Sequence, residues 1–104
     1  MNSVSLFGRL DSEPHLLGMP GRDRCEFWLV TFGRHQGQTA YVQVVAFRGL
    51  AERLSEELSQ GDWVAIDGHL RSEPWPGQRR LYRHTVVARE VQHATVHSLP
   101  ERTE

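Results

Sequence analysis

Arginines and aromatic rings are the side chains of this sequence whose types could do chemistry together. All twelve basic residues among the 104 are arginine, and none is lysine. A guanidinium can form two parallel hydrogen bonds to a phosphate and can stack on a flat ring. An aromatic ring can stack on an unpaired base of any identity. The combination is typical of a surface that contacts phosphates and bases, although genome composition could equally account for the absence of lysine.

The arginines are unevenly distributed along the chain. From His69 to Arg89 five arginines stand against a single acid, Glu73, whereas from Leu50 to Asp62 one arginine stands against four acids. The formal net charge is −1, yet a basic segment on a nearly neutral protein can still attract a polyanion, because the field depends on where the charges lie. Trp75 lies within the basic segment between two prolines, where no core is evident for it to fill.

The segment from Tyr41 to Phe47 predicts a strand with two different faces, because side chains alternate along a strand. One face would be aliphatic and would pack in the core; it comprises Val42, Val44 and Ala46. The other would place Tyr41 and Phe47 at its ends, with Gln43 and Val45 between them. Alternation alone leaves two interpretations of this second face open. It could stack on bases, or it could pack in a subunit interface or under a loop.

Two further tryptophans, Trp28 and Trp63, also fall on outward faces by alternation. Each shares its face with an acid, Glu26 for the first and Asp67 for the second, and acids repel a polyanion. A subunit interface or a minor core is therefore favoured for both.

Alternation and helical periodicity predict five strands, with a short helix between the third and the fourth. The strands are expected at Val4–Leu10, Cys25–Thr31, Tyr41–Phe47, Trp63–Arg71 and Leu81–Val91, and the helix along the stripe Leu50, Ala51, Leu54 and Leu58. Prolines and glycines predict a loop over 11–24 and a turn over 72–80. This order is that of the oligonucleotide-binding barrel (OB-fold), an all-β fold whose second and third strands bind nucleic acid.

The faces of the last two strands are less regular. Alternation places Leu70 on the inner face of the fourth strand, together with Val64 and Ile66. The neighbouring Val86 and Val87 leave the inner face of the last strand undecided. From residue 93 onward no periodicity is present, which predicts a loose tail.

Composition and motifs exclude several classes of protein. A chain of 104 residues with 38% hydrophobic and 24% charged residues is typical of one soluble globular domain. It has no apolar run of about 20 residues and no export signal, so we expect no membrane partner and a cytoplasmic location. Cys25 is the single cysteine, and His93 and His97 lack further ligands, so no metal or other cofactor is expected. No phosphate loop, nucleophile motif or carboxylate pair indicates an enzyme.

Over about residues 2–91 the chain resembles the bacterial single-stranded DNA-binding protein family. The matching segments are, in order, NSVSLFGRL, CEFWLVT, YVQVVAFRGLAERLSEEL, GDWVAIDGHLR and LYRHTVVAREV. Each segment alone would be a weak signal, but five in order at family-like spacing are specific. The resemblance implies a five-stranded OB-fold domain over residues 1–92, with an extended hairpin between strands four and five, and a short flexible tail over residues 93–104.

The resemblance also assigns nucleic-acid-binding residues. The family's stacking aromatics correspond to Tyr41 and Phe47 on the third strand and to Trp75 in the hairpin. A further aromatic of the family falls at His35, a departure that leaves a histidine to stack. Basic residues of the binding faces would correspond to Arg9, Arg34, Arg71, Arg79 and Arg80.

By this resemblance the protein would bind and protect single-stranded DNA without sequence preference during replication, recombination and repair, in the bacterial cytoplasm with the nucleoid. The family is usually a homotetramer, and the sequence does not decide between a tetramer and a dimer. Its partner-recruiting acidic tail has no counterpart in the ending SLPERTE, which implies a short form without that role. The alternative is an OB-fold adaptor between proteins of a primosome or recombination complex. An RNA chaperone of the cold-shock type is disfavoured, because the aromatic-rich strand motifs of that type are missing.

Overall fold

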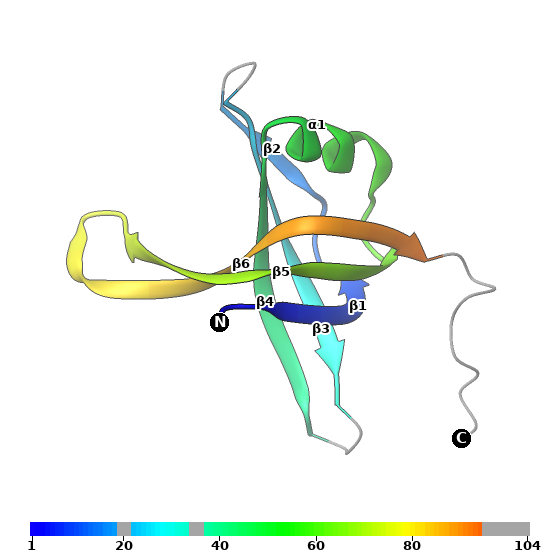
Figure 1. The fold of residues 1–104 in the computed structure, drawn as a ribbon, viewed down its shortest axis with the longest axis horizontal. Coiled ribbons are helices and arrows are strands. Elements are labelled where there is room, and N and C mark those ends of the chain that lie inside the picture. The colour runs from blue at the N-terminus through cyan, green and yellow to red at the C-terminus, as the bar shows by residue number, and fades with distance from the viewer. Residues whose placement is uncertain (19–21, 34–36, 95–104) are drawn as a thin grey trace.

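A computed structural model of the protein describes residues 1–18, 22–33 and 37–94 (Figure 1). Six strands and one short helix account for most of these residues. In chain order they are β1 (Val4–Leu10), β2 (His15–Leu17), β3 (Arg24–Phe32), β4 (Thr39–Phe47), α1 (Arg48–Glu57), β5 (Trp63–Trp75) and β6 (Gln78–Ala94).

Five of the strands close into a barrel. The sheet order is β1-β5-β6-β4-β3-β2, and an additional pairing of β1 with β3 completes a ring of β1, β5, β6, β4 and β3. All neighbours are antiparallel except β4 and β6, which run parallel. The helix lies between β4 and β5 in the chain. These features confirm the predicted all-β, five-stranded OB-fold with a helix after its third barrel strand.

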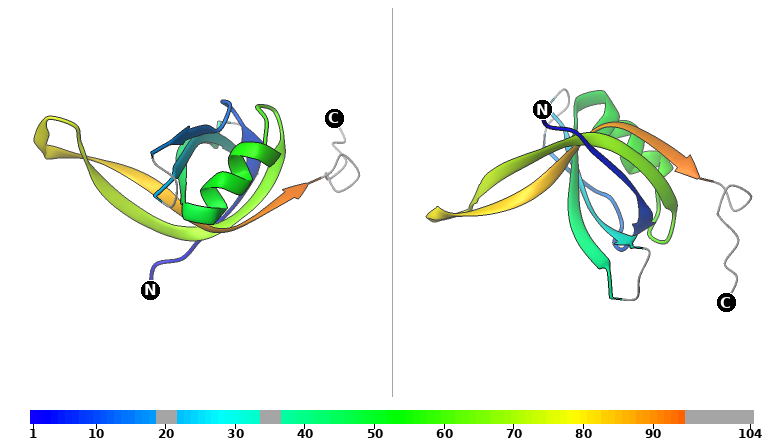
Figure 2. Two further views of the ribbon diagram at one scale, coloured as in Figure 1. Left: turned by 90° about the horizontal axis from the view of Figure 1, so that it is seen from above. Right: turned by 60° about the horizontal axis from the view of Figure 1, so that its bottom comes forward.

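The core fills the barrel and is closed at one end by α1 (Figure 2). Phe27, Leu29, Val44 and Ile66 are buried inside it, and the helix contributes Leu54 to the same cluster. No helix among the described residues has the length and apolar character needed to cross a membrane. Cys25 also lies in this core, where burial raises the pKa of its thiol to about 11, so the thiol is protonated and unreactive at neutral pH.

The hairpin of β5 and β6 projects from the barrel as an arm (Figures 1 and 2), which confirms the extended hairpin that the resemblance implied, and its strands run further than alternation predicted. The turn expected over 72–80 is confined to Pro76 and Gly77, because the residues on either side of them are strand. Gly77 has a φ of 76°, which glycine adopts readily. Beyond the barrel the hairpin is a two-stranded ribbon with open edges, and such edges tolerate a proline such as Pro74.

The end of the β1–β5 pairing explains why the prediction for Leu70 was wrong. The bulge between Asp67 and Gly68 has its extra residue, Arg89, on β6, so the alternation of β5 continues and Leu70 pairs with the buried Val86. However, β1 pairs with β5 only as far as Gly68, and Leu70, which lies beyond that point, is 47% exposed. Val86 and Val87 are both buried, and Val86 is the one that belongs to the core cluster inside the barrel.

Two further sequence predictions need correction. The loop expected over 11–24 contains the short strand β2, whose three residues are all exposed and so leave no burial pattern in the sequence. The sequence predicted a tail from residue 93, but His93 and Ala94 belong to β6 and pair with β5. The rest of the predicted tail lies outside the described residues.

The bulge generates a stability prediction for Gly68. A Cβ on this residue would stand far inside the contact distance of the Val87 carbonyl oxygen on β6. The backbone cannot move aside without disturbing the β5–β6 ladder. We expect Gly68→Ala to lower the free energy of unfolding by about 1–3 kcal/mol, the usual range for overpacking, as measured by urea denaturation.

Gly49→Ala is the matched control for this prediction. Gly49 lies in α1, and no described atom comes within 4 Å of the position its Cβ would take. Alanine favours a helix over glycine by up to about 1 kcal/mol, so this variant should be unchanged or more stable. Equal unfolding midpoints for Gly68→Ala and the unmodified protein would contradict the close approach of β5 and β6.

Candidate nucleic-acid interface

One outer face of the barrel is continuous over four strands. Side chains of residues paired across a ladder point to the same side of a sheet, and Gln43 of β4 pairs with both Trp28 of β3 and Thr85 of β6. Thr85 in turn pairs with Arg71 of β5. We call this surface the outer face. Its exposed or half-buried side chains include Arg24, Glu26, Trp28, Tyr41, Gln43, Phe47, Arg71, Trp75 and Arg83.

Tyr41 and Phe47 lie at opposite ends of β4 on this face, about 20 Å apart at the rise of an extended strand. Tyr41 is 63% exposed, so its ring is open to a ligand. Phe47 is half-buried, and the guanidinium carbons of Arg24 and Arg71 each lie 5.6 Å from its ring centroid. The structure therefore places both predicted aromatics on one face, the first open and the second beside two cations.

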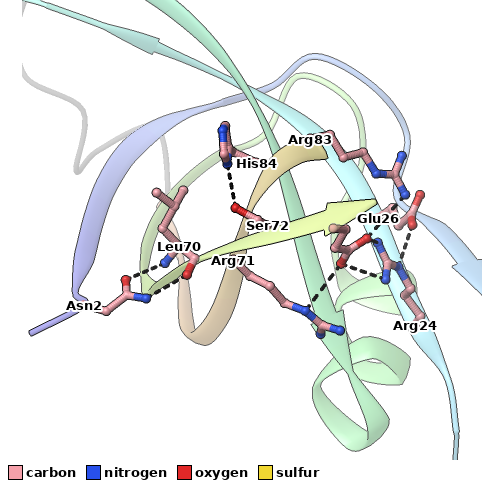
Figure 3. A network of polar contacts seen from close by, with 9 residues as sticks. Asn2, Arg24, Glu26, Leu70, Arg71, Ser72, Arg83 and His84 are labelled. Atoms are coloured by element: carbon pink, nitrogen blue, oxygen red, sulfur yellow. Dashed lines mark hydrogen bonds and ion pairs between the residues drawn. The ribbon is translucent and has the colours of Figure 1, made fainter. Parts of the chain in front are cut away.

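The carboxylate of Glu73 joins three strands at the base of the arm. It accepts two hydrogen bonds from Arg24, at 2.9 and 3.1 Å, and one from Arg83 at 3.4 Å. Arg71 is held less closely, with its Nε 3.9 Å from Glu73 Oε1. Figure 3 shows Arg24, Arg71 and Arg83 converging from β3, β5 and β6. Arg24 also donates to Glu26 at 2.6 Å.

This arrangement determines the ionisation of Glu73, which is only 7% exposed. The hydrogen bonds from Arg24 hold the pKa of the Glu73 carboxyl below its ordinary value, although burial alone would raise it. The charges of Arg24, Arg71 and Arg83 act in the same direction as the hydrogen bonds. The cluster is therefore fully ionised at neutral pH, and it fixes the base of the arm against β3.

Trp75 lies near the tip of the arm and is 47% exposed. The guanidinium carbon of Arg83 is 5.5 Å from its ring centroid. Residues 74–79 line a shallow cavity of about 360 Å³ around the ring, and this lining includes Arg79. Arg80 follows on β6 and is exposed. The structure thus brings the predicted residues Trp75, Arg79 and Arg80 together on the arm.

The remaining predicted residues divide into two groups. Arg9 is exposed on β1 and pairs with Val30, which in turn pairs with Tyr41, so Arg9 lies on the same side of the sheet as Tyr41. Arg34 and His35 lie outside the described residues.

Several arginines of the outer face were missed by sequence reasoning. Arg24 and Arg83 support Phe47 and Trp75, but each binds Glu73, a residue distant in the chain from Arg24. No local pattern signals such a pairing. Tyr82 could have been found from composition, because it is an aromatic within the basic segment; it is exposed on the arm opposite Pro74.

Trp63 lies in a small aromatic cluster and not among the arginines of the outer face. Its ring lies 5.5 Å from that of Phe7 and 5.9 Å from that of Phe32, measured between centroids. Phe7 and Phe32 are 40% and 44% exposed, so the cluster lies at the surface, and the subunit interface and the minor core both stay predictions for Trp63. Trp28, by contrast, is 47% exposed on the outer face, next to Glu26.

The Glu73 cluster generates a prediction about stability and pH. The lowered pKa means that the ionised carboxylate stabilises the fold above about pH 4.3, the ordinary value for glutamate, and that this stabilisation is lost as the pH falls through the folded value. We expect Glu73→Gln to lower the free energy of unfolding by about 1–3 kcal/mol at neutral pH. In urea denaturation, the difference from the unmodified protein should shrink as the pH falls from about 6 to about 3.

Glu57→Gln provides the control. Glu57 is exposed, and its ion pair with Arg53 at 3.6 Å is a surface pair one turn along α1. Such pairs contribute roughly 0–1 kcal/mol, so this variant should unfold almost as the unmodified protein does. A difference for Glu73→Gln that does not change with pH would contradict the role of its charge.

Comparison with known proteins places the chain in a family. A sequence model of the single-strand binding protein family matches residues 1–94. Single-stranded DNA-binding protein 2 of Staphylococcus aureus (strain COL) is 33% identical over 100 residues, which cover 88% of this chain and 72% of that protein. The single-stranded DNA-binding proteins of Bacillus cereus and Neisseria meningitidis serogroup A are 33% and 29% identical and are covered over 59% and 58% of their lengths.

The chain thus spans less than two thirds of the length of the last two relatives. Its whole described barrel lies within residues 1–94, which the family model matches. The family match covers every strand of the barrel and the arm that carries Trp75. The chain belongs to the single-strand binding protein family.

Proposed function

We propose that this protein binds single-stranded DNA without sequence preference and protects it during replication, recombination and repair. The observation that carries the proposal is one continuous outer face on which Tyr41, Phe47 and Trp75 lie among arginines. The names of its relatives support the same ligand. We place this activity in the bacterial cytoplasm, in association with the nucleoid.

The physical basis is stacking combined with phosphate pairing. Each base stacked on a ring contributes roughly 1–3 kcal/mol with little preference for its identity. Exposed arginines such as Arg9, Arg79 and Arg80 would pair with phosphates, which carry no sequence information. Because phosphate binding releases counterions, the affinity would fall as the salt concentration rises.

We further propose that the barrel acts as a homo-oligomer, a tetramer by its resemblance to the family. Apolar side chains exposed away from the basic part of the outer face, such as Leu70 and Phe7, are available for contacts between copies. Sedimentation of the purified protein would distinguish a tetramer from a dimer or a monomer.

A titration tests the proposed function. Tryptophan emission should be quenched on addition of an oligo-dT strand and far less by duplex DNA, and the affinity should fall with salt. We expect Trp75→Ala to weaken binding by about 1–3 kcal/mol for each base that the ring stacks, as measured by the same titration with a labelled strand.

Trp28→Ala is a matched control, because Trp28 has the same exposed fraction of 47% but lies beside Glu26. Its loss of affinity should be much smaller than that of Trp75→Ala. If no single strand binds the unmodified protein, the proposal fails, and the alternative of a protein–protein adaptor is favoured. If binding is retained in full by Trp75→Ala, the arm is not part of the site.

A further inference from the structure

An open groove lies where β4 meets α1. It has a volume of about 860 Å³ and is lined by Arg22, Asp23, Phe47, Arg48 and Arg71. These residues come from the segment before β3, from the β4–α1 junction and from β5. We call it the Phe47 groove. It combines one aromatic ring with three guanidinium groups, of which only that of Arg71 was expected from the sequence to contact nucleic acid.

The arginines around Phe47 differ in how far they are already engaged. Arg24 is bound to both Glu26 and Glu73. Arg22 and Arg48 are exposed, and no carboxylate of the described residues lies within ion-pair distance of either. Their charges are therefore uncompensated, which is the condition for attracting an anion.

The one acid that lines the groove is already partnered elsewhere. Asp23 is buried, and its carbonyl accepts a hydrogen bond from the backbone N–H of Arg48 at 2.9 Å. A hydrogen bond with Asp23 raises the pKa of the Glu52 carboxyl on α1. Asp23 makes no ion pair within 4.0 Å with the described arginines of the groove.

The backbone at Arg48 is what directs two successive side chains into one groove. Neighbouring residues of a regular strand point to opposite faces, yet Phe47 and Arg48 both line this concavity. Arg48 has a φ of 59°, in the left-handed region that residues other than glycine rarely adopt. Strained backbone of this kind persists where the surroundings hold it, and it concentrates at functional sites. Here the hydrogen bond to Asp23 holds it.

We propose that Arg22 and Arg48 bind a backbone phosphate of the single strand beside a base stacked on Phe47. The inference rests on the proposed function and adds to it a defined phosphate site at the α1 end of β4. Two guanidinium groups from different segments can each donate two hydrogen bonds to the phosphate oxygens. Arg71, only loosely held by Glu73, can contribute a third.

Arg48→Gly is the critical variant, because glycine adopts the left-handed backbone without strain and the fold should be retained or stabilised. Binding is measured with an oligo-dT strand that lacks terminal phosphates, so that only internal phosphodiesters are present. We expect Arg48→Gly and Arg22→Gln each to weaken binding about tenfold at low salt. Each should also reduce the slope of log affinity against log salt by about 0.7, the value for one lost phosphate contact with a single strand.

Arg53→Gln is the matched control. Arg53 lies one turn further along α1, pairs with Glu57 and donates to the Val91 carbonyl, and it does not line the groove. The Arg53→Gln variant should have the same affinity for the strand and the same salt slope as the unmodified protein. If the unmodified protein binds the strand and both groove variants keep its affinity and slope, the phosphate site is wrong while the proposed function stands. If the unmodified protein does not bind, both proposals are overturned.

Discussion

The buried carboxylate of Glu73 is the interaction on which the outer face depends. Its three ion-pair partners are Arg24, Arg71 and Arg83. The same three guanidinium groups lie over Phe47 and Trp75. One acid at the base of the arm therefore positions the cations beside two aromatic rings from different strands. It also ties the base of the arm, formed by β5 and β6, to β3.

The arginines fall into two groups. Some are hydrogen-bonded to Glu73 and have a structural role, whereas others remain free for a ligand. Arg24 and Arg83 are hydrogen-bonded to Glu73, so much of their charge is neutralised within the protein. Arg22, Arg48 and Arg80 have no carboxylate partner among the described residues. A chain with a formal net charge of −1 can thus present local positive charge, because many of its acids lie on or near α1 at one end of the barrel.

Local pattern was sufficient to predict the barrel but not its long-range contacts. Alternation identified the five barrel strands and placed Tyr41 and Phe47 on one face, because a strand's own side chains report which face is buried. It failed at Leu70, which keeps the inner side of β5 but lies beyond the last residue of β5 that pairs with β1 and is exposed there. It also predicted strands that are too short for the arm, because proline usually ends a strand. The edges of a two-stranded ribbon nevertheless accept Pro74. The pairing of Arg24 with Glu73, and the strained backbone that turns Arg48 into the Phe47 groove, are properties of the assembled fold.

Glu73 binds Arg24 more closely than it binds Arg71. This difference explains how the Phe47 ring, which both cations already cover, could accept a base. A cation–π contact at an exposed site contributes about 0.5–1 kcal/mol, less than the roughly 1–3 kcal/mol of a stacked base. Arg24 is fixed over Phe47 by short hydrogen bonds to two acids, whereas Arg71 is 3.9 Å from its only carboxylate partner among the described residues. Arg71 is therefore the guanidinium that can turn aside at least cost. In the proposed complex, a base that takes its place over Phe47 would bring its own phosphate into the groove, where Arg71 would gain a stronger, charge-assisted partner.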